Sequence, residues 1–209
     1  SHIGYYSLIL GFILSISLLI YSIYCFRKNN TQINKNIFSI LFLQFFTVII
    51  SFISLVYSFV ISDFSNETVY NNSHTTKPIF YKISGTWGNH EGSLLLWLLV
   101  LNLFIFIFLI RTKSLLKNYR ILTLLFQQML IVGFFIFLIS SSNPFNYVFP
   151  VPNEGLGLNP ILQDPALAIH PPILYLGYVG SSIIFSSVLA ATTLNYISKI
   201  WAMHIKNWI

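Results

Sequence analysis

The 209-residue chain is 56% hydrophobic and 17% aromatic, and only 8% of its residues are charged. Soluble globular domains average about 25% charged residues, and disordered segments are poor in aromatic side chains. The composition therefore excludes both classes and indicates an integral membrane protein. The single cysteine, Cys25, excludes an internal disulfide and a four-cysteine zinc site. The net charge of +6 does not indicate nucleic-acid binding, because the eleven basic residues follow a membrane pattern instead.

Five stretches of the chain are long and apolar enough to cross a bilayer, whose core of about 30 Å needs roughly 20 residues of helix. In hydrocarbon each backbone N–H and C=O must be paired within its own segment, which favours helices. The sequence therefore predicts an all-α membrane protein with a single domain over residues 1–209. Its five transmembrane helices are expected at about residues 5–26, 37–61, 94–110, 121–139 and 173–194.

The connections between these stretches differ in charge and in length. Nine of the eleven basic residues lie in the first connection, the third connection and the tail, whereas all five acidic residues lie in the second and fourth connections. Because basic residues stay on the inner side of a membrane, this pattern predicts an outer N-terminus, an inner C-terminus and two long outer loops. Residues 80–93 and 159–172 are the parts of these loops that carry motifs.

The first motif loop contains three glycines, Trp87, His90 and Glu91 within a short run. Trp87 suits the level of the lipid headgroups, and Glu91 is expected just before the third helix, where an acid favours the helix N-terminus. Ser93 is a candidate cap of that helix. His90 beside Glu91 is compatible with a ligand or a proton relay, and equally with an interfacial turn that has no chemical role.

The second motif loop ends in His170-Pro171-Pro172. Proline fits the first turn of a helix, so Pro171 and Pro172 are expected to open the fifth span and to bias His170 away from helical geometry. This prediction puts His170 at the outer mouth of a membrane helix, where a neutral imidazole suits an axial position on haem iron. A solvated interfacial histidine is the alternative.

The spans contain few polar side chains, and their spacing is informative. Ser182, Ser186 and Ala190 recur every four residues, as do Gly177 and Ser181, and small residues at this spacing predict close packing against another helix. Four amides are expected to face the interior of the bundle: Gln44, Asn102, Gln127 and Gln128.

Taken together, the two loops resemble one family. Residues 85–97 read Gly-Thr-Trp-Gly-Asn-His-Glu-Gly-Ser-Leu-Leu-Leu-Trp. Residues 159–180 read Asn-Pro-Ile-Leu-Gln-Asp-Pro-Ala-Leu-Ala-Ile-His-Pro-Pro-Ile-Leu-Tyr-Leu-Gly-Tyr-Val-Gly. Both runs, their order and their placement resemble the N-terminal region of CcmF, the haem lyase of the system I pathway of cytochrome c maturation.

The resemblance implies a function, a cofactor and a set of partners. It implies attachment of haem to apocytochrome c through thioether bonds, and a b-type haem with His170 as one axial ligand of the iron. Trp87, His90, Glu91 and Tyr175 are weaker candidates near this site, and no catalytic residue is assigned. The partners implied are a haem chaperone, apocytochrome c with its presenting subunit, membrane lipid, and a companion CcmF chain that carries the family's Trp-rich loop and remaining histidines.

That loop and those histidines have no counterpart in these 209 residues, so the expectation is an N-terminal piece of a lyase split over several chains. The abundance of Phe, Ile, Asn, Tyr and Lys favours the mitochondrial inner membrane, with both motif loops in the intermembrane space. A bacterial inner membrane with a periplasmic face is the alternative location. A non-catalytic structural subunit of a larger assembly is the alternative function, and a transporter is disfavoured because no charge lies within a span.

Overall fold

The structure is a computed structural model that describes residues 1–28, 35–206 and 208. Its long helices are α1 (His2–Arg27), α2 (Lys35–Val60), α5 (His90–Arg111), α6 (Lys117–Ser141) and α7 (Pro165–Thr193). All five are long and apolar enough to cross a membrane. Within the described residues the only β pairing is one isolated bridge between Asn66 and Tyr147. The prediction of an all-α membrane protein with five spans is therefore confirmed.

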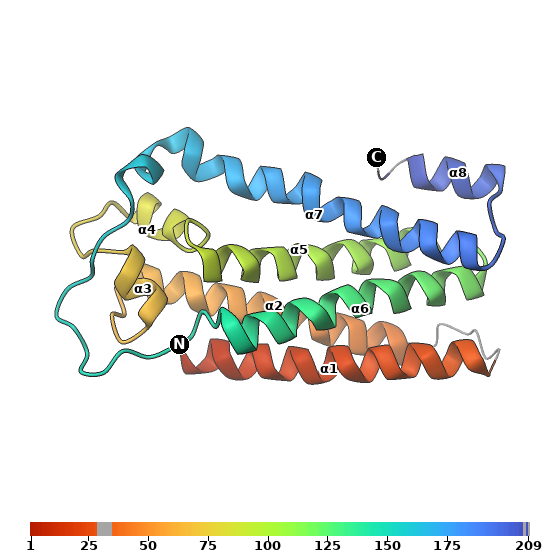
Figure 1. Cartoon of the computed structure of the whole chain (residues 1–209), viewed down its shortest axis with the longest axis horizontal. Helices are drawn as coiled ribbons and strands as arrows, with labels where there is room; N and C mark the ends of the chain where they lie inside the picture. The colour runs from red at the N-terminus through yellow and green to blue at the C-terminus, as the bar shows by residue number, and fades with distance from the viewer. Residues whose placement is uncertain (29–34, 207, 209) are drawn as a thin grey trace.

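Four short helices lie at the two ends of the long ones (Figure 1). The helices α3 (Glu67–Asn72), α4 (Ile79–Gly85) and η1 (Pro160–Gln163) lie at the end that also holds the N-terminus, and α8 (Lys199–Lys206) lies at the opposite end. Both long connections thus share one end, as the alternation of spans requires. Which end faces outward remains a prediction from the distribution of basic residues.

The five long helices form three layers (Figure 1): α7 forms the first, α5 and α6 form the middle one, and α1 and α2 form the third. On one side α1 packs against α2 and α6, and on the other side α7 packs against α5 and α6. Large apolar side chains cover the outward surfaces, including Ile3, Ile53 and Tyr57. An apolar outer surface of this extent is compatible with lipid and not with water. Within the described residues, α7 packs mainly against α5 and α6, and many of its other side chains are exposed.

The amides that the sequence places in the spans face inward and bond to one another. The Nε2 of Gln44 donates to Asn102 Oδ1 at 2.7 Å and to Gln128 Oε1 at 3.3 Å, which joins α2 to α5 and α6. Gln127 Nε2 donates to Ser182 Oγ, and Ser186 Oγ donates to Gln127 Oε1, which joins α6 to α7. The predicted inward orientation of these amides is confirmed.

The small residues of α7 divide between two faces. Ser186 and Ala190 are fully buried, and Ser182 contacts α6 through its hydrogen bond with Gln127, so this series packs within the chain as predicted. In contrast, Gly177 and Ser181 are exposed. Packing of this second series against another helix is not found within the described residues.

Candidate functional site

The junction of α4 and α5 is organised by Asn89. Its Oδ1 accepts a hydrogen bond from the Gly92 N–H at 2.7 Å, and its Nδ2 donates to the carbonyl of Gly85 at 2.6 Å. Asn89 is thus the N-cap of α5 and also pairs an orphan carbonyl at the end of α4. The expectation that Ser93 caps this helix is wrong, because α5 begins at His90 and the Ser93 hydroxyl donates to the His90 carbonyl.

Gly92 allows this junction to be tight. A Cβ at this position would collide with the carbonyl oxygen of Thr86, which lies directly over the first turn of α5. No side chain can therefore replace the glycine without a shift of the backbone. The three glycines of the first motif thus include one that is required sterically.

The helix α7 begins earlier than the sequence indicated. Asp164 is its N-cap, with Oδ1 accepting from the N–H groups of Ala166 at 2.8 Å and Leu167 at 3.0 Å, and Pro165 occupies the first helical position. Pro171 and Pro172 therefore lie inside the helix rather than at its start, and His170 has helical geometry. The expectation failed because Asp-Pro forms a complete helix start and outweighs the preference of a residue before proline for extended backbone.

Trp87 compensates for one of the two prolines inside α7, Pro172. In an α-helix the N–H of residue i bonds to the carbonyl of residue i−4, so Pro172 leaves the carbonyl of Ala168 without its helical donor. The indole Nε1–H of Trp87 donates to that carbonyl at 2.8 Å. Ala168 is buried, so this hydrogen bond pairs a group that water does not reach. The first motif thereby stabilises the helix that begins in the second.

Apolar contacts join the two motif loops near this hydrogen bond. The side chains of Leu158 and Leu162 lie over the backbone of Gly88, next to Trp87. About two turns into α5, Trp97 packs against Tyr175 of α7, with ring centroids 5.4 Å apart in an edge-to-face arrangement. Two candidates from the sequence thus take part in contacts on the inner side of α7: Trp87 through its hydrogen bond to Ala168, and Tyr175 through its packing against Trp97.

His170 lies on the opposite side of α7, which no other helix of the described chain covers. Its side chain is exposed, as are those of Ile173, Leu174 and Tyr178 on the following turns. The candidate ligand is thus held by a helix whose inner side is anchored and whose outer side is open.

His90 and Glu91 contact the end of α6 and the neighbouring loop rather than α7. His90 Nδ1 lies 3.3 Å from Ser142 Oγ, and its ring meets Phe137 edge-on at 6.3 Å. Glu91 lines a polar pocket of about 240 Å³ with Glu67, Thr68, Asn71 and residues 141–143 and 146. The structure therefore does not bring His90 and Glu91 together with His170.

A further connection between the outer loops was not apparent in the sequence. Glu154 accepts hydrogen bonds from the hydroxyl of Thr75 at 2.5 Å and from the N–H groups of Thr75 and Gly155, each at 3.0 Å. The Thr75 hydroxyl, followed by these amides and nearby His74, lowers the pKa of Glu154 to about 2. No local sequence pattern predicts this pairing, because the two residues are 79 positions apart.

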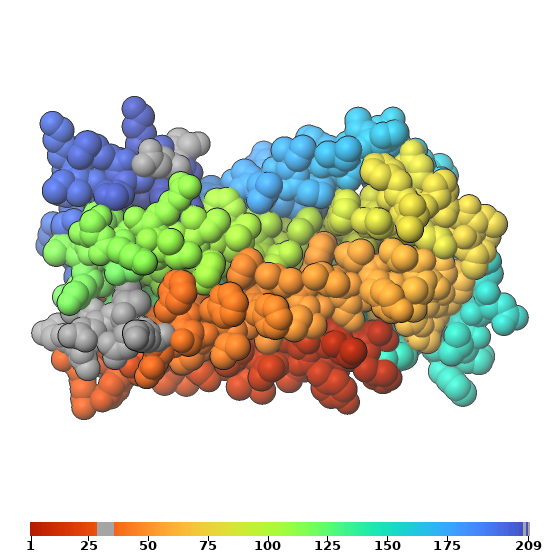
Figure 2. Space-filling model, turned by 180° about the vertical axis from the view of Figure 1, so that it is seen from behind, coloured from red at the N-terminus to blue at the C-terminus, as the bar shows by residue number. Residues whose placement is uncertain are grey.

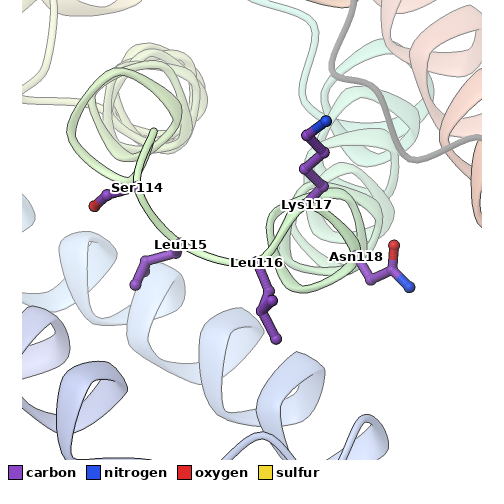
Figure 3. Close-up of a pocket in the computed structure, with 5 residues that line it drawn as sticks. All are labelled: Ser114, Leu115, Leu116, Lys117 and Asn118. Carbon is purple, nitrogen blue, oxygen red and sulfur yellow. The ribbon is translucent and has the colours of Figure 1, made fainter.

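At the opposite end, the turn between α5 and α6 forms an open pocket of about 430 Å³. Its lining side chains diverge from one another, with Lys117 and Asn118 pointing to different sides from Ser114 (Figure 3). A site for a small ligand needs polar groups that converge. This pocket therefore carries no functional assignment.

Comparison with known proteins agrees with this geometry. Residues 87–208 match the family described as "Cytochrome C assembly protein". The chain is 39% identical over 206 residues to the cytochrome c-type biogenesis protein CycK of Rhizobium meliloti, covering 99% of this chain and 30% of that protein. It is 37% identical to CcmF of Haemophilus influenzae, covering 100% of this chain and 32% of that protein.

A solved structure titled "Cytochrome c Heme Lyase CcmF" has the same fold. It superposes with a TM-score of 0.81 at 23% identity, covering 99% of this chain and 32% of that one. The chain thus spans about a third of the length of these relatives. The family match and the two motif loops, which the Trp87–Ala168 hydrogen bond joins, agree. The chain therefore belongs to the cytochrome c assembly protein family, as a CcmF-type member.

Proposed function

We propose that this chain is the N-terminal part of a CcmF-type haem lyase and that it supplies His170 as one axial ligand of a b-type haem in the membrane. The observation that carries the proposal is the position of His170, exposed on the uncovered side of a membrane helix. A histidine that served only to stabilise the chain would be expected to contact the bundle.

The residues around His170 fit haem. A neutral imidazole is a common axial ligand of haem iron, and apolar walls around it exclude water. Ile173, Leu174 and Tyr178 supply such a wall on the same side of α7. When bound, the b-type haem would supply one-electron redox chemistry, which keeps incoming haem iron reduced.

Contacts on the inner side of α7 fix the position of the helix that carries His170, which favours its role as a haem ligand. Ligands work best when packing and hydrogen bonds fix the element that carries them. The hydrogen bond from Trp87 to Ala168 lies two residues before His170, and the contact between Trp97 and Tyr175 follows on the next turns. In this proposal Trp87 and Tyr175 are positioning residues and do not touch the haem.

The remaining parts of the lyase come from other segments. The resemblance implies a second histidine ligand and a Trp-rich loop, and we propose that a companion chain supplies both by packing on the uncovered side of α7. The reaction adds the S–H of an apocytochrome thiol across a vinyl group of haem, forming one C–S and one C–H bond without an external oxidant. The haem chaperone and the subunit that presents apocytochrome c would approach from the end that holds the motif loops.

We place that end in the intermembrane space of mitochondria, from the composition of the chain. The relatives named above are bacterial, and in a bacterial member the same loops would face the periplasm. Fractionation of the native membrane, followed by protease protection of residues 142–164, distinguishes these locations and tests the outer position of the loops.

The first experiment is a reduced-minus-oxidised absorption spectrum of the gently solubilised native complex. His170→Ala should remove the b-type band and abolish haem attachment to apocytochrome c. His204→Ala is the matched control, because His204 lies in α8 at the opposite end, and it should retain both. A b-type band of full intensity in His170→Ala would refute the ligand assignment.

Copurification separates this function from that of a structural subunit. Mass spectrometry of the native complex should identify a companion chain with the Trp-rich loop. If respiratory subunits copurify in its place and no haem is present, the chain is a scaffold and the lyase proposal is wrong.

A further inference from the structure

A groove lined by mostly apolar residue types and one arginine crosses the surface toward the end of the bundle opposite the motif loops. It has a volume of about 440 Å³ and is lined by Phe104, Ile107, Arg111, Leu176, Gly177, Gly180 and Trp208. Seen from behind, the surface is hollowed between α7 and α8, over α5 (Figure 2). This volume is within the range of ligand sites in proteins, about 300–1,000 Å³.

Two glycines shape the groove. Nothing lies within 4 Å of a Cβ built on Gly177, so the space beside it is open. Gly180 instead lets the ring of Phe104 lie close against α7, because a Cβ there would approach that ring to 2.7 Å. The result is a shallow channel with an aromatic floor, in the part of the surface that faces lipid.

The residues at the end of the groove are of the types found at the level of lipid headgroups. Trp208 packs on Phe104 and Phe108, with ring centroids 6.0 and 5.7 Å apart, and an indole favours the headgroup level. The amphipathic helix α8 lies beside it, with Ile205 buried and with Lys199 and Lys206 at its ends. Helices of this kind lie in the interface plane.

Arg111 gives the groove a positive charge at one end. It is the last residue of α5, is exposed, and lines the groove. All five Asp and Glu residues lie in the connections at the opposite end, so within the described residues no acidic side chain lies beside it. A planar guanidinium binds phosphate through paired hydrogen bonds. An apolar channel that ends at such a group matches an acyl chain attached to a phosphate.

We propose that this groove binds one anionic phospholipid from the leaflet on the basic side. An acyl chain lies along Gly177 and Phe104, and the phosphate contacts the Arg111 guanidinium. Charge complementarity favours this occupant over a neutral lipid or an apolar helix of a partner. The groove does not include His170, which precedes Gly177 by two turns of α7 on the same exposed face, toward the motif loops.

Native mass spectrometry of the intact chain or its native complex tests the proposal, with dioleoylphosphatidylglycerol and dioleoylphosphatidylcholine as probes. One phosphatidylglycerol should remain bound, and Arg111→Gln should weaken its binding about tenfold, the effect of losing one charge-assisted contact. Arg27→Gln is the matched control, because Arg27 is also an exposed arginine at the same end of the bundle but lines no part of the groove.

A second pair of variants tests the channel itself. Gly177→Leu should fill the groove and displace the lipid, whereas Gly133→Leu should not, although Gly133 is also a helical glycine with open space around it. Arg111→Lys keeps the charge and should bind with intermediate affinity. Four outcomes would each overturn the proposal. The first two are an equal loss of phosphatidylglycerol binding in Arg111→Gln and Arg27→Gln, and equal retention of phosphatidylcholine and phosphatidylglycerol. The other two are displacement of the bound lipid by inorganic phosphate alone, and unchanged lipid binding in Gly177→Leu.

Discussion

The indole of Trp87 donates a hydrogen bond at 2.8 Å to the carbonyl of Ala168, the group that Pro172 leaves without a helical donor. Two motifs that lie about 80 residues apart in the sequence are thus parts of one structural unit. The first motif supplies the donor, and the second supplies both the acceptor and the proline that exposes it. The histidine of the second motif follows two residues later, on the open side of the same helix.

Trp87→Phe is expected to destabilise the chain. It keeps an aromatic ring but leaves the buried carbonyl of Ala168 unpaired, which costs about 1–3 kcal/mol. Thermal unfolding of the purified protein in mild detergent measures the effect. Trp97→Phe is the control, since that indole contributes ring packing against Tyr175, and it should change stability less.

The same hydrogen bond can be tested by a double-mutant cycle. Pro172→Ala restores an N–H that can bond to the Ala168 carbonyl within the helix. In that background Trp87→Phe should cost clearly less than in the natural sequence, with a coupling energy of about 1 kcal/mol. Additive effects of the two substitutions would show that Pro172 and Trp87 act independently.

Gly92→Ala is expected to disrupt the junction of α4 and α5. The added methyl group would overlap the Thr86 carbonyl, and the required backbone shift costs about 1–3 kcal/mol or more. Gly133→Ala in α6 is the opposite case. Its Cβ meets nothing within 4 Å, so the gain in helix propensity should stabilise the protein by up to about 1 kcal/mol. Melting temperatures that fall for both variants would contradict this explanation.

The amide cluster of Gln44, Asn102 and Gln128 is expected to contribute to stability within the bundle. Gln44→Leu removes the donor to two buried oxygens, and interhelical hydrogen bonds in membranes are worth about 0.6–2 kcal/mol. Gln127→Leu breaks the separate contact with α7. The two substitutions should be additive in unfolding measurements, and strong coupling between them would indicate one continuous network.

The link between Thr75 and Glu154 should depend on pH in a defined direction. The pKa of Glu154 is lowered from its ordinary value of 4.5 to about 2, mainly by the Thr75 hydroxyl. Its contribution to stability is therefore complete above about pH 4.5 and is lost as the pH falls toward 2. Hydrogen exchange of the Thr75 and Gly155 amides should show protection that persists at pH 4 and disappears in Glu154→Gln.

Thr75→Val tests the cause of this shift. Without the hydroxyl, the pKa of Glu154 should rise toward its ordinary value, and the amide protection should be lost at a higher pH than in the natural protein. An unchanged pH dependence would assign the shift to the backbone N–H groups instead.

The sequence was sufficient for the number and class of the helices. An apolar segment of about 20 residues has one stable conformation in hydrocarbon, so composition and length alone predicted five spans, and each lies within a few residues of its predicted position except at the start of α7. The inward orientation of Gln44 and Gln127 was predictable for the same reason, because an amide that faces lipid is left unpaired.

The helix starts and the convergence of the motifs required the tertiary structure. Local rules favoured Pro171 as the start of the fifth span, but Asp164 supplies a complete cap seven residues earlier. The prolines then lie inside a helix, and the carbonyl that Pro172 leaves without a helical donor is paired by a side chain from another part of the chain. No local pattern carries that information.

The sequence by itself thus determined the number and positions of the apolar spans, which depend on the transfer of side chains and backbone from water to lipid. The tertiary structure decided which motif residues share a site: Trp87 and Tyr175 lie with the helix of His170, and His90 and Glu91 lie apart from it. The physical reason is that the transfer of a segment into lipid depends on the composition of that segment alone. Hydrogen-bond pairing and packing between side chains depend instead on which segments meet in space.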